Sequence, residues 1–86
     1  MINQSDHPVA WAILLYELED AQEHLENFSK QMSREGRIDV EDFTIQIAHV
    51  YAHLNRVWNA RNEVSELTDE QWTAFRKFPA DIEPVA

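Results

Sequence analysis

Three histidines have the type and spacing that could support metal chemistry. His49 and His53 are four residues apart, so they share one face of a helix, a spacing that metal sites use. An antiparallel partner helix would bring His24 level with them on the same edge, with Asp20 nearby. The neighbouring residues give neither His-Glu-x-x-His nor Glu-x-x-His, and histidines beside a helical seam are more often hydrogen-bonded boundary residues. We therefore predict no metal ion and no cofactor, with His24, His49, His53 and Asp20 as the candidate ligands should one bind.

Two Glu-x-x-Glu pairs are the second candidate for chemistry. Glu23 with Glu26, and Glu63 with Glu66, mimic the pairs with which all-helical nucleotide pyrophosphohydrolases hold magnesium. A magnesium site needs carboxylates that converge on one point, and these two pairs fall at different heights. The absence of cysteine and the single glycine also disfavour a nucleophilic thiol and a phosphate-binding loop. We therefore predict that the protein is not an enzyme, with a carboxylate-metal hydrolase as the alternative.

Composition and charge narrow the class of partner. Sixteen acidic and seven basic residues give a net charge of −9 over 86 residues, which argues against nucleic-acid backbones and anionic membrane surfaces. No apolar run approaches the ~20 residues that cross a bilayer. Residues 1–7 show no secretory pattern, and there is no cysteine for disulfides. These features predict a cytoplasmic protein with neither a nucleic-acid nor a membrane partner. The acids either maintain solubility or suit a basic protein partner.

Two apolar stripes with helical spacing position the candidate residues. The first lies on a helix expected over about 7–35, and the second on a helix expected over about 39–66. The stripe residues are Trp11, Leu14, Leu18, Ala21, Leu25, Phe28 and Met32, then Phe43, Ile47, Val50, Leu54, Val57 and Val64, with Arg61 in the one missing place facing Leu14. Gly36 is the predicted C-cap of the first helix and Asp39 the N-cap of the second. A turn this short folds the two helices antiparallel.

A capping box predicts a short third helix. Thr68 and Gln71 have the spacing of reciprocal caps, so we expect a helix over about 68–78 and a frayed tail over 79–86. The predicted architecture is one all-α domain over residues 1–86: an antiparallel helical hairpin of two long helices plus a short C-terminal helix.

The apolar faces of this hairpin are wider than two helices can enclose. The exposed residues gather toward the open end and form the predicted interface: Val9, Trp11, Ile13, Leu15, Tyr16, Tyr51, Trp58, Trp72 and Phe75. A second copy that completes a four-helix bundle is the simplest cover, and a monomer whose last helix wraps further is the alternative. We predict a homodimeric protein–protein interaction module, adaptor-like or inhibitor-like. The alternative function is a metal- or small-ligand-binding helical protein that uses the His24, His49 and His53 edge or the aromatic open end.

Overall fold

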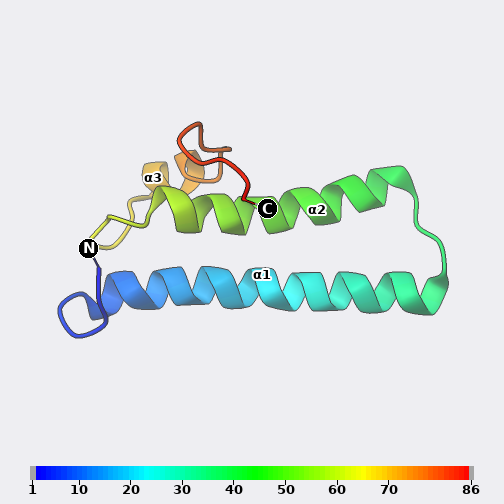
Figure 1. Cartoon of the computed structure of the whole chain (residues 1–86), viewed down its shortest axis with the longest axis horizontal. Coiled ribbons are helices and arrows are strands. Elements are labelled where there is room, and N and C mark those ends of the chain that lie inside the picture. Colours follow the sequence, from blue (N-terminus) through cyan, green and yellow to red (C-terminus); the bar gives the residue numbers. More distant parts are fainter. Residues whose placement is uncertain (1, 86) are drawn as a thin grey trace.

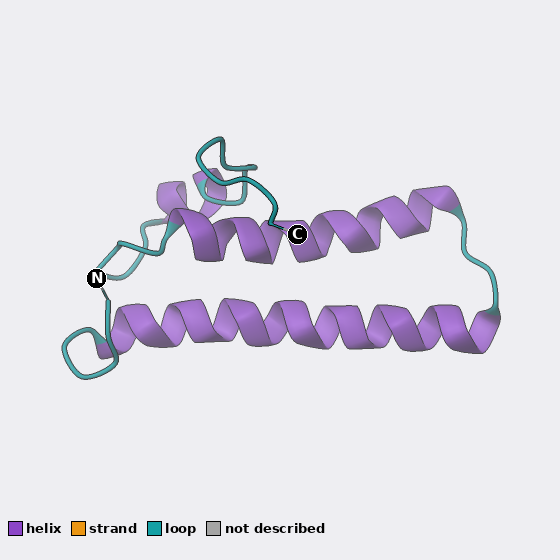
Figure 2. Ribbon diagram, viewed as in Figure 1, coloured by secondary structure: helices purple, strands orange, loops and turns teal. Residues whose placement is uncertain are grey.

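The molecule is an antiparallel helical hairpin with a short third helix. The computed structural model describes residues 2–85, and the helices are α1 (Pro8–Glu35), α2 (Val40–Asn59) and α3 (Asp69–Ala74). α1 and α2 pack side by side, with the turn between them at one end of the molecule, and α3 lies on the outer side of α2 (Figure 1). Residues 2–85 contain helices and loops but no strand (Figure 2). The predicted all-helical hairpin is therefore confirmed.

The turn between the long helices depends on glycine at one position. Gly36 has φ 68° and ψ 10°, the left-handed conformation, and its N–H donates a hydrogen bond to the Met32 carbonyl. Glycine adopts this conformation with little strain because it has no Cβ. Asp39 occupies the N-cap of α2, but its side chain makes no capping hydrogen bond. Glu41 and Asp42 place negative charge in the first turn of α2 instead, where it interacts favourably with the helix dipole.

α2 ends at Asn59, so the prediction that it continues to Glu66 is wrong. Arg61 turns back and donates from Nη1 to the Trp58 carbonyl at 2.8 Å, while its guanidinium lies 3.8 Å from the centre of the Trp58 ring. Arg61 therefore helps to cap the helix and does not face Leu14 as expected. The chain then returns toward α1, where Leu67 shares a small crevice with residues 10, 13 and 14.

α3 begins as predicted and ends earlier. Thr68 Oγ1 accepts a hydrogen bond from the Gln71 N–H at 3.1 Å, and Gln71 Oε1 accepts one from the Thr68 N–H at 3.0 Å, so both halves of the capping box are present. The helix ends at Ala74, short of Phe78, and the residues that follow bind α2. Asn55 Nδ2 donates to the Arg76 carbonyl, and Asn59 Nδ2 donates to the carbonyls of residues 75 and 77.

The C-terminal segment is held along α2, where we expected a frayed tail. Asp81 accepts a hydrogen bond from the indole Nε1 of Trp58 at 2.7 Å and forms an ion pair with Arg61 at 3.1 Å. Phe78 packs edge-to-face on Tyr51, with ring centres 5.2 Å apart. These contacts cover one end of the outer surface of α2.

The apolar core of the molecule is thin. Its buried apolar residues are Ile2, Ala10, Ala21, Phe28, Val50 and Ala60. Half of these are alanines, and none of the larger described side chains is fully enclosed. Phe28 makes the main aromatic contact, edge-to-face with Phe43 at 5.3 Å between ring centres. The hairpin therefore leaves much of its apolar surface in contact with solvent.

None of the described helices is both long enough and apolar enough to cross a membrane.

Candidate functional site

Polar residues of α1 and α2 face each other along one side of the hairpin. We call this set the polar edge: Glu17, His24 and Gln31 of α1, with Asp42, Gln46, His49, His53 and Arg56 of α2. The α1 members recur every seven residues and the α2 members at steps of four and three, so each set forms one stripe on its helix. At the turn end, Gln46 Nε2 donates to Gln31 Oε1 at 2.8 Å. The polar edge therefore contributes direct contacts between the two helices.

The three candidate histidines meet in the middle of the polar edge. The ring centres of His24 and His49 are 4.2 Å apart, those of His49 and His53 are 4.9 Å apart, and those of His24 and His53 are 5.4 Å apart. One ligand nitrogen from each ring lies within 4.8 Å of the other two. His24 and His49 are exposed, whereas His53 is buried. Asp20 is outside this cluster, on the exposed surface of α1.

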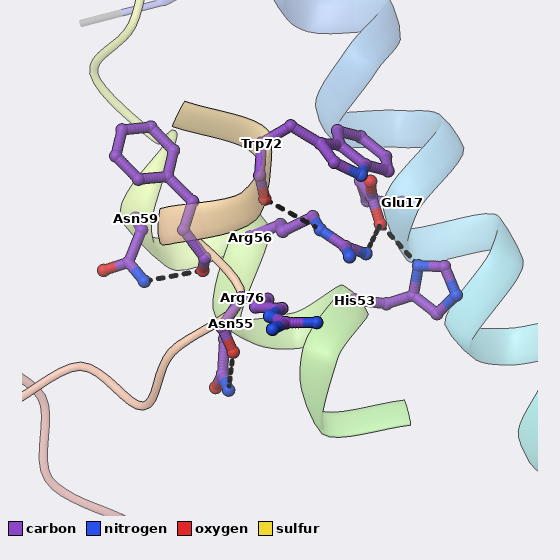
Figure 3. A network of polar contacts seen from close by, with 8 residues as sticks. Glu17, His53, Asn55, Arg56, Asn59, Trp72 and Arg76 are labelled. Atoms are coloured by element: carbon purple, nitrogen blue, oxygen red, sulfur yellow. Dashed lines mark hydrogen bonds and ion pairs between the residues drawn. The ribbon is translucent and has the colours of Figure 1, made fainter. Parts of the chain in front are cut away.

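Glu17 of α1 contacts His53 of the cluster, and this contact was not predicted from the sequence. Its Oε2 lies 2.5 Å from His53 Nδ1 and 3.8 Å from Arg56 Nη1, with only 5% of the carboxylate side chain exposed (Figure 3). A buried carboxylate is destabilising unless it is paired, and these two groups pair it. No role was predicted for Glu17 from the sequence. The signal that could have found it is its seven-residue spacing from His24 on the same stripe.

Arg56 links the cluster to α3. Its guanidinium carbon lies 4.2 Å from the centre of the Trp72 ring, and its Nε donates to the Trp72 carbonyl at 3.4 Å. Trp72 thus closes the end of the polar edge beside Glu17 (Figure 3). This aromatic residue was predicted as part of an interface, and in the monomer its ring already packs on Arg56.

The surroundings of His49 favour its neutral form. Loss of hydration lowers the pKa of His49, and the neighbouring His24, His53 and Arg56 lower it further, while Asp20 opposes them. The Glu17 carboxylate contacts Nδ1 of His53, so the ring nitrogen that remains for another contact is Nε2. His53 Nε2 is buried and has no hydrogen-bond partner among residues 2–85. A buried polar atom without a partner is unusual and carries a desolvation penalty.

A second surface, apolar and free of charge, flanks the helix contact on the other side. Ala21 is buried in the contact between the two helices. His24 follows it by three residues and Leu25 by four, so around the axis of α1 His24 lies about 60° to one side of Ala21 and Leu25 about 40° to the other. His53 and Leu54 bear the same relation to the buried Val50. We call the apolar side the open face. Its members are 39–46% exposed: Trp11, Leu15, Leu18, Leu25, Met32, Phe43, Tyr51 and Leu54.

The open face includes a groove at its centre. Leu25 of α1 and Ile47, Tyr51 and Leu54 of α2 line it, with Val50 at its floor. Tyr51 and Leu54 also line a second groove that continues onto the C-terminal segment at Phe78. The face is therefore continuous across both long helices.

The predicted interface residues divide between several places. Trp11, Leu15 and Tyr51 belong to the open face. Val9 and Tyr16 are exposed at 56% and 65%, but by helical spacing they lie on the back of α1. The other predicted members are partly covered within the chain: Ile13 by the segment around Leu67, Trp58 by Arg61 and Asp81, and Trp72 by Arg56, while Phe75 is half-buried.

The glutamate pairs do not assemble a site. Glu26 is exposed and pairs with Lys30 at 2.9 Å, and this hydrogen bond lowers the pKa of Glu26. Within residues 2–85, the one cluster of three or more potential metal ligands consists of His24, His49 and His53, and it contains no acidic residue.

Comparison with known proteins identifies no relative: no family model, curated protein or solved structure matches the chain. The two surfaces described above are therefore the features of the chain that point to a function.

Proposed function

We propose that the chain is a homodimeric interaction module whose open face is covered by a second copy. The observation that carries this proposal is the row of eight apolar side chains, each 39–46% exposed, along one side of the hairpin. Contiguous apolar patches of more than a few hundred Å² usually mark an interaction surface. Two such hairpins that pair through their open faces would form a four-helix bundle.

The exposed area suits a dimer. With roughly 150–200 Å² for each side chain, the lower part of the range for aromatic residues, the eight leave about 600 Å² of apolar surface on one copy at these exposures. Pairing two copies through this face would bury about 1,200 Å², at the lower limit of stable protein–protein interfaces. A twofold axis would match the face to itself along its whole length.

Charge also favours a second copy over a basic partner. The chain has a net charge of −9, yet no member of the open face is charged. A basic partner would be selected by acidic groups within the contact, and here, among residues 2–85, the one acidic residue that lines the two grooves is Glu83, on the C-terminal segment. In a homodimer the acidic surfaces of both copies come closer together, so added salt should strengthen association by screening their repulsion. Added salt should weaken binding to a basic partner.

Oligomeric state tests the proposal directly. The chain mass is 10.1 kDa, and we expect sedimentation equilibrium to give twice this mass, with a dissociation constant that falls as salt rises. Leu25→Asp places a charge at the centre of the open face and should yield a monomer. Ile45→Asp is the matched control: Ile45 is 61% exposed and lies about 180° around α2 from Leu54, so this variant should remain dimeric. The proposal would be overturned if the wild type were monomeric at about 100 μM, or if the Leu25→Asp variant were dimeric.

A further inference from the structure

The imidazole cluster has an arrangement that hydrogen bonding within the chain does not explain. Three rings from two helices have their ligand nitrogens within 4.8 Å of one another. Among residues 2–85, the one hydrogen bond that these rings make joins His53 to Glu17. Three imidazoles that were all protonated would repel each other at this separation. A shared cation would instead use all three nitrogen lone pairs at once.

The surroundings of His53 provide independent support for a ligand. Its side chain is 10% exposed, its Nδ1 contacts the Glu17 carboxylate at 2.5 Å, and its Nε2 is buried without a partner. In the neutral ring, a proton on Nδ1 donates to this carboxylate and the lone pair on Nε2 remains for a ligand. Carboxylate–histidine–metal arrangements of this kind fix the orientation of the ring and increase its basicity.

We propose that His24, His49 and His53 bind one divalent transition-metal ion of the zinc class, with Glu17 orienting His53. Three nitrogen donors without a carboxylate among them suit Zn²⁺, Co²⁺, Ni²⁺ or Cu²⁺, whereas Mg²⁺ and Ca²⁺ prefer oxygen. In tetrahedral zinc sites the ligand nitrogens are about 3.3 Å apart, from zinc–nitrogen distances of ~2.0–2.1 Å. The exposed rings of His24 and His49 can close this difference by side-chain rotation, while Glu17 holds His53. The fourth position faces solvent and would take water.

The metal site and the dimer are independent of each other. The polar edge and the open face flank the α1–α2 contact on opposite sides, so both can be occupied in one molecule. Binding of an ion would link α1 to α2 in the middle of the hairpin and stabilise the folded chain by mass action. The net charge of −9 also favours uptake of a cation.

The experiment is isothermal titration of the chelator-treated full chain, without a polyhistidine tag, with ZnCl₂. Titration with CoCl₂, followed by the visible absorption of four-coordinate cobalt, is the second readout. We expect one ion per chain. His24→Ala and His49→Ala should each weaken binding more than tenfold, and both residues are exposed, so folding should be retained. Glu17→Gln should weaken it by about 10- to 100-fold.

His7→Ala is the matched control, because His7 is the remaining histidine and lies at the start of α1 outside the cluster. This variant should bind as the wild type does. The proposal is overturned if the wild type gives neither heat nor a cobalt band, or if His24→Ala and His49→Ala bind with unchanged affinity. Loss of binding in the His7→Ala variant would also overturn it. Sedimentation of the metal-free chain reports on the dimer separately, so either proposal can fail alone.

Discussion

Two asparagines of α2 should determine whether the C-terminal segment stays docked. Asn55 is 6% exposed and donates to the Arg76 carbonyl at 2.8 Å. Asn59 donates to the Phe75 carbonyl at 2.8 Å and to the Lys77 carbonyl at 3.0 Å. α3 has only six residues, too few to be stable by itself. The double variant Asn55→Ala with Asn59→Ala should therefore release α3 and the residues that follow it.

The expected magnitude follows from the three hydrogen bonds. Each contributes about 0.5–1.5 kcal/mol, so loss of all three should favour local opening by about 1.5–4.5 kcal/mol. This corresponds to a rise of roughly 10- to 1,500-fold in the opening equilibrium constant, at 1.4 kcal/mol per factor of ten. Alanine has a higher helix propensity than asparagine, so α2 itself should not be weakened.

Amide hydrogen exchange measured by mass spectrometry tests this prediction. Peptides covering residues 69–78 should lose protection in the double variant, while peptides from the centres of α1 and α2 should keep theirs. Asn62→Ala is the control, because Asn62 is exposed and lies in the adjoining turn. Unchanged protection over residues 69–78 would refute the reasoning, and so would an equal loss across the whole hairpin.

Three further predictions concern other parts of the fold. Phe28→Ala removes the largest buried apolar side chain and should lower the free energy of unfolding by about 3–5 kcal/mol in urea titration; a change below 1 kcal/mol would contradict its central position. Gly36→Ala should lower the free energy of unfolding by about 1–2 kcal/mol, because alanine is strained at a φ of 68°. No atom lies near enough to clash with the added Cβ, so this backbone strain is the whole cost; Gly36→Asn should lower the free energy of unfolding less. The hydrogen bond from Trp58, with help from Arg61, holds the pKa of Asp81 below its usual range. A lowered pKa in the folded state means that docking of the tail is favoured above the ordinary carboxyl pKa and lost as pH falls through the folded value. Trp58 fluorescence should therefore stay constant from neutral pH down to the ordinary carboxyl range and change below it, and Asp81→Asn should remove that change.

The sequence was sufficient to predict the hairpin. The two apolar stripes, the single glycine at position 36 and the Thr68–Gln71 capping box are local or periodic signals, and each corresponds to a feature of the fold. Such signals depend on only a few neighbouring residues or on one helical repeat, so they can be read without knowing the partner of any side chain. Periodicity also placed His24, His49 and His53 on one edge, but it did not establish that the rings meet.

Tertiary contacts decided the remaining features. α2 ends at Asn59, and just beyond it Arg61 donates hydrogen bonds to the Trp58 carbonyl and to Asp81, a residue twenty positions away. Glu17 is buried because His53 and Arg56 pair with it from the other helix. A helical repeat states which side chains share a side of a helix, but not what covers that side. The physical reason is that burial and pairing depend on groups distant in sequence, and their positions exist only once both helices are in place.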